Sequence, residues 1–197
     1  MLYFIKNRGD YLVDITKKVI IDSFKELASK KNVSDITVKE ITDKCGLKRQ
    51  TFYNHFKDKY DLIKWIYLNE VILKIENDDD WTEKYKEIFK YFIENKQMVL
   101  NIYNCEAQNY LIHFILRQSK PIIEKVIDEK SKNTNIKEED KDFLCLFYSG
   151  ALGALIINWI ELGMYDDIDS LVNKVKILLD GNISNYVNMT KYGKCQK

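Results

Sequence analysis

"GLKRQTFYNHFKDK", residues 46–59, holds one of only three arginines among the 31 basic residues of the chain. Phe52 and Phe56 are four residues apart, so in a helix they lie on the same face. No Asp or Glu occurs between Lys48 and Lys57, although the chain contains 30 acidic residues. The sequence therefore predicts a short helix with an apolar face for packing and a polar face without negative charge.

The segment before this one predicts another short helix. Thr37 and Glu40 have the spacing of a capping box, in which each side chain accepts a hydrogen bond from the backbone N–H of the other. Gly46 can take the left-handed conformation that ends a helix, which leaves this helix about two turns long. Helices this short are not stable alone in water. Two of them joined by a glycine turn form a helix-turn-helix unit, whose second helix lies in the major groove of DNA.

Helical periodicity continues on both sides of this unit. Asp58 is expected to begin a helix that runs to about Ile75. Seven glycines and one proline are too few for the turns of an all-β fold. The predicted fold class is therefore all-α. A first helix is predicted from the apolar stripe of Ile20, Phe24, Leu27 and Ala28.

The rest of the chain predicts further helices, for a total of about nine. Asp80, Asn135 and Asp167 are placed to cap three of them. Pro121 lies in a long helical segment and is expected to kink or divide it, because proline removes a backbone N–H donor.

Charge is divided unevenly along the chain. Residues 1–60 contain 13 Lys and Arg against 8 Asp and Glu, a balance of +5, so residues 61–197 carry +1 − 5 = −4. A basic front is expected of a domain that binds a polyanion. We predict an N-terminal three-helix DNA-binding domain with a helix-turn-helix in residues 1–60. Residues 61–197 are predicted to be a C-terminal helical bundle for dimerisation and effector response.

The polar face of the second short helix has the chemistry needed to read DNA. Arg49 can bind O6 and N7 of guanine through two hydrogen bonds, and Gln50 or Asn54 can bind N6 and N7 of adenine. The alternative is an ordinary corner of two helices with a solvated outer face. The side chains expected at DNA phosphates are Thr37, Lys48, Thr51, Tyr53, His55 and Lys59.

The longer stretch ITVKEITDKCGLKRQTFYNHFKDKYDLI resembles the DNA-binding domain of the TetR family of bacterial regulators. Within it, RQTFYNHF looks most like the branch related to DhaS, regulators of dihydroxyacetone kinase. SGALGALIINWIELGM is similar to the C-terminal helix of that branch. Gln50 and Cys45 depart from the small residues common at these positions in the family, and Gln50 bears on which operator is bound. The resemblance implies that DNA is faced by Thr37, Lys48, Arg49, Gln50, Thr51, Tyr53, Asn54, His55 and Lys59.

The segment FLCLFYSGALGALIINWI, residues 143–160, is apolar on all sides, which predicts a helix that is buried all round. With the amphipathic helix after Asp167, it is expected to form half of a four-helix bundle that a second copy completes. The resemblance also implies this homodimer. The alternative is an internal helix of a monomer. The predicted interface residues are Phe147, Gly150, Ala154, Ile157, Leu171, Val175 and Leu178.

The segment between these regions is where the resemblance implies an effector pocket. Its candidate lining residues are Tyr103, Tyr110 and His113. His113 also has the spacing of a buried histidine that is satisfied within the core. Some relatives take their signal from a partner protein, so the effector is either a small molecule or a protein.

Other classes of protein lack their characteristic residues. The four cysteines lie 40 to 60 residues apart, which matches neither a zinc site nor a redox pair. No cofactor is expected. The longest apolar run, residues 151–160, is about half of what a bilayer crossing requires, and the first residues are too weakly apolar for a signal peptide. A cytoplasmic protein without a membrane span is therefore predicted.

These patterns predict a regulator that binds double-stranded DNA as a dimer and is not an enzyme, since no phosphate loop, HExxH or nucleophile elbow occurs. We expect a repressor that responds to an effector. The alternatives are an activator controlled by a protein partner, a helical interaction module that does not touch DNA, and an enzyme hidden in the rear bundle.

Overall fold

The computed structural model describes residues 15–72, 80–132 and 136–192. Over these ranges it contains nine α-helices and no strand, which confirms the predicted all-α class. The helices are α1 (Ile15–Ala28), α2 (Val38–Lys44), α3 (Arg49–Tyr53), α4 (Lys59–Ile66), α6 (Trp81–Glu94), α7 (Lys96–Tyr103), α8 (Gln108–Ser131), α9 (Glu138–Glu161) and α10 (Ile168–Tyr192). A 3₁₀ turn, Val33–Asp35, joins α1 to α2.

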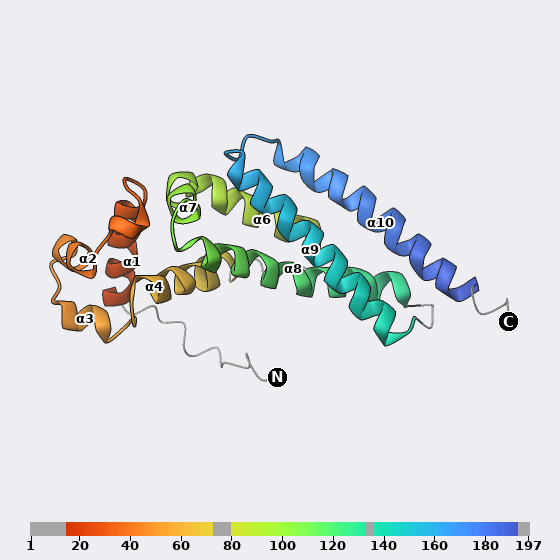
Figure 1. The fold of residues 1–197 in the computed structure, drawn as a ribbon, viewed down its shortest axis with the longest axis horizontal. Coiled ribbons are helices and arrows are strands. Elements are labelled where there is room, and N and C mark those ends of the chain that lie inside the picture. The colour runs from red at the N-terminus through yellow and green to blue at the C-terminus, as the bar shows by residue number, and fades with distance from the viewer. Residues whose placement is uncertain (1–14, 73–79, 133–135, 193–197) are drawn as a thin grey trace.

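The molecule is elongated (Figure 1). Helices α1 to α4 form a small cluster at one end, which we call the head, and α6 to α10 form the longer remainder, which we call the rear bundle. In the rear bundle α8 and α9 pack along each other, and α10 covers α6 and α8. The buried side chains of the head include Ile20, Phe24, Ile41, Phe52, Phe56 and Leu62, and they belong to one hydrophobic cluster that continues into the rear bundle.

Most predicted helix boundaries are confirmed. The Thr37 capping box is present, and the side chain of Asp58 accepts hydrogen bonds from the N–H groups of Tyr60 and Asp61. Asp80 accepts from the N–H of Thr82 at the start of α6. The predicted cap Asn135 lies outside the described residues, and α9 begins after Lys137, which makes no side-chain cap. These short polar contacts satisfy backbone donors that a helix start leaves unpaired.

Two long helices differ from their predictions. Pro121 lies inside α8 and does not divide it, because α8 continues from Gln108 to Ser131. The helix that begins after Asp58 stops being α-helical at Ile66 and continues as a π-helical segment, Tyr67–Ile72. A π-helix arises where one extra residue is fitted into a helix, which frees a carbonyl from its usual partner.

The π-helical segment, which follows α4, contacts both the head and the rear bundle. Within the segment, the side-chain amide of Asn69 donates to Trp65 O at 2.8 Å. Glu70 accepts from Lys25 of α1 at 2.6 Å and from the hydroxyl of Tyr91 of α6 at 2.9 Å. One carboxylate thus joins the two parts of the molecule through charge-assisted hydrogen bonds, which are stronger than neutral ones.

Candidate nucleic-acid interface

The inner face of α3 is held to the head by two aromatic rings. Phe52 is fully buried and Phe56 is 2% exposed, and their ring centroids are 5.8 Å apart. Gly46 has a φ of 67°, which is the left-handed conformation that glycine adopts readily. The next residue, Leu47, donates its N–H to Thr42 O at 2.9 Å. The predicted glycine turn and inner apolar face of α3 are both confirmed.

The outer face of α3 is open to solvent and lies at the end of the head (Figure 1). Tyr53 keeps 52% exposure, although its ring packs edge-on against Phe52 with centroids 5.6 Å apart. Thr51 and His55 are half-buried at the sides of the helix. This segment therefore brings seven of the nine predicted DNA-facing residues together. The exposed ones are Lys48, Arg49, Gln50, Tyr53 and Asn54.

Gln50 and Asn54 contact each other across one turn of this face. Gln50 Nε2 donates to Asn54 Oδ1 at 3.2 Å. The bond leaves Gln50 with a free carbonyl oxygen and one N–H, which is the pair of groups that adenine N6 and N7 require. The sequence placed Gln50 and Asn54 on the same helix, and the structure shows in addition how their two amides are oriented toward each other.

Thr37 lies apart from α3, at the start of α2, and is exposed. Its Oγ1 accepts from the N–H of Glu40 at 3.2 Å, and its own N–H donates to Glu40 Oε2 at 2.9 Å. The hydroxyl also donates to Glu40 Oε2, at 3.1 Å. Both donors of Thr37 are therefore already used by one carboxylate, in contrast to the free hydroxyl expected for a phosphate contact.

Glu40 is stabilised as an anion by two neighbours. Lys31 Nζ lies 2.5 Å from Glu40 Oε1. The hydrogen bond from Lys31, together with that from the Thr37 N–H, lowers the pKa of the Glu40 carboxyl from 4.5 to about 2. The start of α2 thus carries its own negative group, which is stabilising at a helix N-terminus.

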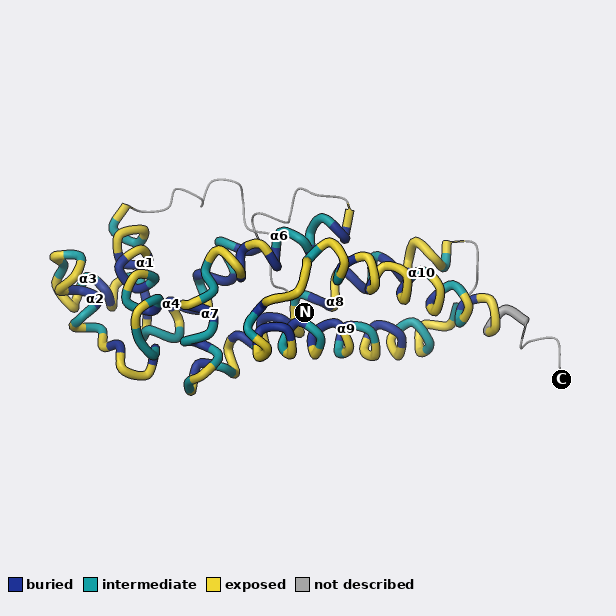
Figure 2. Tube along the Cα trace, turned by 90° about the horizontal axis from the view of Figure 1, so that it is seen from above, coloured by how far each residue is buried: buried dark blue, intermediate teal, exposed yellow. Residues whose placement is uncertain are grey.

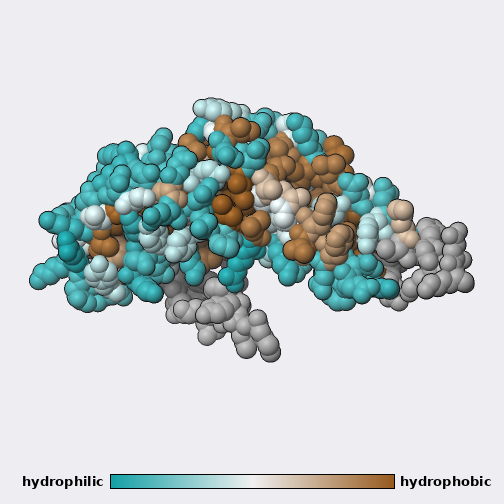
Figure 3. Space-filling model, viewed as in Figure 1, coloured by the Kyte–Doolittle hydropathy of each residue, from teal (hydrophilic) through white to brown (hydrophobic). Residues whose placement is uncertain are grey.

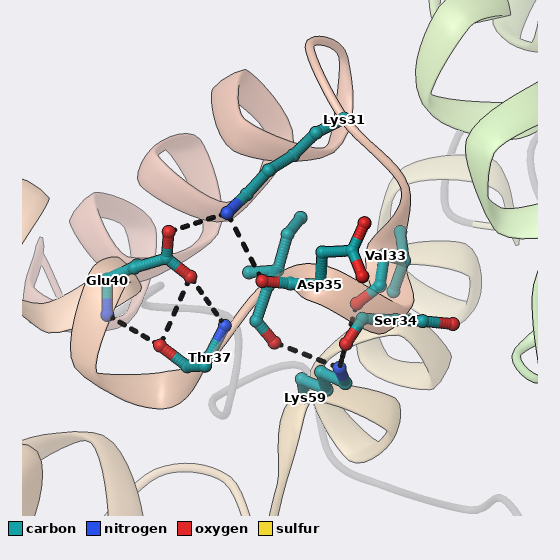
Figure 4. Close-up of polar contacts among 8 residues, drawn as sticks. Lys31, Val33, Ser34, Asp35, Thr37, Glu40 and Lys59 are labelled. Carbon is teal, nitrogen blue, oxygen red and sulfur yellow. Dashed lines mark hydrogen bonds and ion pairs between the residues drawn. The ribbon is translucent and has the colours of Figure 1, made fainter.

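The ammonium of Lys59 points into the head rather than outward (Figure 4). It donates to the carbonyl oxygens of Val33, Ser34 and Ile36 at 2.7, 2.9 and 2.9 Å. An ammonium has three N–H donors, so all of them are used. Burial lowers the pKa of Lys59, as expected for a cation removed from water. This geometry corrects the expectation that Lys59 binds phosphate, because no donor remains for one.

The seven predicted dimer residues lie on α9 and α10, and three of them are exposed. Phe147 is 59% exposed and Leu178 is 58% exposed, and Ala154 is also exposed. Gly150, Ile157 and Leu171 are half-buried. Figure 2 shows exposed residues along the outer side of α9, and Figure 3 shows hydrophobic residues gathered around α9 and α10.

Val175 differs from the other predicted interface residues. It is only 7% exposed and lines a small cavity with Trp81 and Leu152. It therefore belongs to the core of the single chain. The sequence prediction missed four large apolar side chains that are exposed on α9, just after it, or on α10. They are Phe143, Leu146, Leu162 and Ile177.

The residues predicted to line an effector pocket line neither of the two cavities described below. Tyr110 is 43% exposed and its ring stacks on Tyr60 of α4, with centroids 5.4 Å apart. His113 is exposed, so it is not the buried histidine that its spacing suggested. Tyr103 is half-buried. The side chains of α8 that face the interior are others, such as Phe114.

Two small cavities lie in the rear bundle. One is lined by residues of α6, α8 and α9, and the other by residues of α6, α9 and α10, and each has a volume of about 10 Å³. A cavity of this size has room for about one water molecule. The first is lined by Tyr85, Ile88, Phe114, Ile115, Gln118, Ser119 and Ile156.

No group of three or more His, Cys, Asp or Glu that could hold a metal ion occurs among the residues that the structure describes. By length and composition alone, α9 could cross a membrane. In this fold it packs along α8, and 44% of its apolar window is buried within the chain. A core helix of a soluble bundle has the same pattern.

Two protein families match the sequence. Residues 20–66 match the bacterial regulatory proteins of the tetR family. Residues 79–181 match a transcriptional regulator C-terminal region. The first range covers most of the head, and the second covers α6 to α9 with half of α10.

Individual proteins are similar over most of the chain. The HTH-type dhaKLM operon transcriptional activator DhaS of Lactococcus lactis subsp. lactis is 28% identical over 170 residues, which are 84% of this chain and 89% of the relative. The solved structure of a dihydroxyacetone kinase operon activator DhaS has a TM-score of 0.71 at 26% identity, covering 86% of this chain and 96% of that chain. FadR from Bacillus subtilis in complex with stearoyl-CoA shares the fold, with a TM-score of 0.57 at 19% identity over 82% and 96% of the two chains.

Proposed function

The chain belongs to the TetR family of bacterial regulatory proteins, and we propose that it acts as a homodimer on a palindromic DNA site. It is a DNA-binding transcription regulator and not an enzyme. We assign DNA binding to residues 1–60 and dimerisation with effector response to residues 61–197. We also place it in the cytoplasm, where its DNA would be.

One observation carries the proposed mode of DNA binding. The outer face of α3 is exposed, carries no carboxylate, and is anchored from behind by Phe52 and Phe56. We propose that Arg49, Gln50 and Asn54 contact base edges in the major groove. The side chains proposed to contact the flanking phosphates are Lys48, Thr51, Tyr53 and His55. We propose that Thr37 contacts a phosphate as well, by donating its hydroxyl to the phosphate in place of Glu40.

The exposed apolar face of α9 and α10 supports the proposed homodimer. Leu146 and Phe147 of α9 are 75% and 59% exposed, and Ile177 and Leu178 of α10 are 64% and 58% exposed, so both helices present large apolar side chains to solvent. A second copy would cover the same surface by twofold symmetry. A Cβ added to Gly150 would meet nothing within 4 Å, so a partner helix could approach closely there.

The sign of regulation is proposed from two observations. The similar DhaS proteins are named as operon activators. The rear bundle has a packed core, and the two cavities described above each have room for about one water. We therefore propose that the protein is an activator controlled by a partner protein, and we rank this above a repressor controlled by a small effector.

One observation favours the small-effector alternative. The hydroxyl of Tyr67 and Nε1 of Trp159 are buried, and neither has a hydrogen-bond partner among the residues that the structure describes. A buried polar atom without a partner costs free energy, and a ligand with polar groups would remove that cost if the core opened. Thermal shifts of the purified protein with a panel of small metabolites would separate the alternatives, because a specific ligand raises the melting temperature and a protein-controlled regulator shows no shift.

Titration on the protein's own upstream DNA over a salt series tests the proposal as a whole. We expect one dimer per site, measured by mass, and a steep linear fall of log K with log salt as counterions are released. Transcription in vitro from the same promoter, with and without the protein, then gives the sign. Binding to no DNA fragment would favour the helical interaction module, and a monomer in solution would contradict the dimer.

A further inference from the structure

Four successive carbonyl groups of the turn between α1 and α2 accept hydrogen bonds from lysines (Figure 4). Lys59 takes those of Val33, Ser34 and Ile36, and Lys31 donates to Asp35 O at 3.2 Å. Carbonyls at the end of a 3₁₀ turn have few partners of their own. The two ammonium groups therefore supply donors that the backbone of this turn lacks.

Lys59 also joins two distant points of the chain. It is the first residue of α4, and its bond to Ile36 O spans 23 residues of sequence. Those residues include α2, the Gly46 turn and α3. The segment before α2 is thus hydrogen-bonded to the first residue of α4, so the two ends of the helix-turn-helix unit are held together.

We propose that Lys59 is a positioning residue for DNA binding, which holds α3 in its binding orientation by tying α4 to the 33–36 turn. This inference rests on the proposed function. Lys59 acts through backbone carbonyls, without contact to DNA. Its effect on affinity comes from the α3 surface, where Arg49 and Gln50 must meet base edges within a few tenths of an ångström.

The identity of the residue follows from this role. A lysine ammonium is a compact charge whose three N–H groups can point to three converging carbonyls. The guanidinium of arginine is planar, with its donors arranged as a fork, so it cannot match this arrangement. At a phosphate, in contrast, arginine is as good as lysine or better. Exchange of Lys59 for arginine therefore separates the two roles.

The experiment compares Lys59→Arg, Lys59→Gln and the control Lys57→Gln in the full chain. Lys57 is exposed, carries the same charge, and lies two residues earlier. Affinity for the DNA site is measured over a salt series, at a temperature where each variant is shown to be folded by circular dichroism. Hydrogen exchange by mass spectrometry is followed in the peptide that contains residues 31–41.

We expect both Lys59 variants to bind about tenfold more weakly with the salt slope of the wild type, since no phosphate contact is lost. Exchange in residues 31–41 should become faster in both, because the Ile36 N–H bond to Val33 O loses its support. Lys57→Gln should leave this exchange unchanged.

Three results would overturn the inference. Lys59→Arg could bind like the wild type while Lys59→Gln binds more weakly, or Lys59→Gln could lower the salt slope by about 2, the value for one phosphate contact in each subunit. Either result would return Lys59 to phosphate binding. Wild-type affinity in both folded variants would leave Lys59 with a purely structural role. If the wild type binds no DNA at all, the proposed function fails, and the exchange data still test the tie itself.

Discussion

α3 has five residues and α9 has 24, and the two helices keep their outer faces in place by different means. α3 is too short to be stable alone, so it depends on Phe52 behind it and on the glycine turn and the Lys59 tie at its two sides. α9 lies along α8 for much of its length and needs no such ties. Its outer face is apolar, with Leu146 and Phe147 open to solvent.

The difference lies in what each surface requires. A face that reads bases needs side chains that are fixed in direction. In the head, many buried and polar contacts therefore hold a few exposed residues in place. A face that pairs with its own copy needs apolar area and close approach, which a long helix with small residues provides. Changes in the head should therefore affect binding through geometry, and changes in α9 through assembly.

The largest effect is expected from Phe52→Ala, which removes a fully buried ring. Loss of a buried phenyl group costs about 3–5 kcal/mol, which is a large share of the stability of a small protein. DNA binding should be lost, while size-exclusion chromatography still shows the assembly of the rear bundle. Tyr53→Ala, at the exposed neighbour, should leave the melting curve unchanged. Equal destabilisation by both variants would contradict the anchoring role of Phe52.

The second prediction uses two glycines of α9. Gly150→Leu should weaken the proposed dimer by on the order of 3 kcal/mol, because overpacking costs about 1–3 kcal/mol and twofold symmetry repeats it. Sedimentation should show monomers with an intact fold. Gly153 faces α8, and a Cβ there would lie 2.3 Å from Leu116 Cδ2. Gly153→Leu should therefore lower the melting temperature. If Gly150→Leu keeps the dimer mass, α9 is not the interface.

A smaller effect is expected from Arg49→Ala, which leaves the fold of the head unchanged. Loss of a bidentate contact to guanine costs about 1–3 kcal/mol and relaxes the preference at one base pair. Competition binding with operator variants at each position measures this. A uniform loss on every sequence would instead assign Arg49 to phosphate.

The smallest effect concerns pH. The pKa of Glu40 is lowered to about 2 by Lys31 and Thr37. The unfolded chain takes up its proton near 4.5 and the folded head only near 2, so this stabilisation is present above pH 4.5 and is lost as the pH falls toward 2. Melting temperatures between pH 2 and pH 6 should fall less steeply for Glu40→Gln than for the wild type. Asp43→Asn, at an exposed acid on α2, serves as control, and an identical slope in Glu40→Gln would contradict the prediction.

Local patterns in the sequence predicted the head well. The Thr37 capping box, the left-handed Gly46 and the burial of Phe52 each depend on residues within a few positions of one another, so spacing alone identifies them. The same reasoning failed for Lys59. Its three acceptors lie 23 to 26 residues away, and only the packing of α4 against the preceding turn brings them together.

The rear bundle was harder to predict because α9 is apolar on every side. Periodicity cannot then tell the face that packs within the chain from the face left open, so the exposed Leu146 was missed. On α10, Val175 was expected at the interface and is buried within the chain. His113 failed for a related reason. Helical spacing places it near the core stripe of α8, but the direction in which α8 packs turns it outward. Such orientations depend on neighbouring helices far away in the sequence.

The π-helical segment, Tyr67–Ile72, has a consequence for the distance between the two ends of the molecule. An extra residue in a helix turns everything beyond it by about 100° and moves it by about 1.5 Å. Deleting one residue there would restore an ordinary helix and rotate each head relative to its rear bundle. In the proposed dimer both heads would turn, and their spacing would no longer match one pitch of the double helix. The one extra residue in this segment would thus set the rotation of each head, and with it the spacing at which the two heads of the dimer meet the DNA.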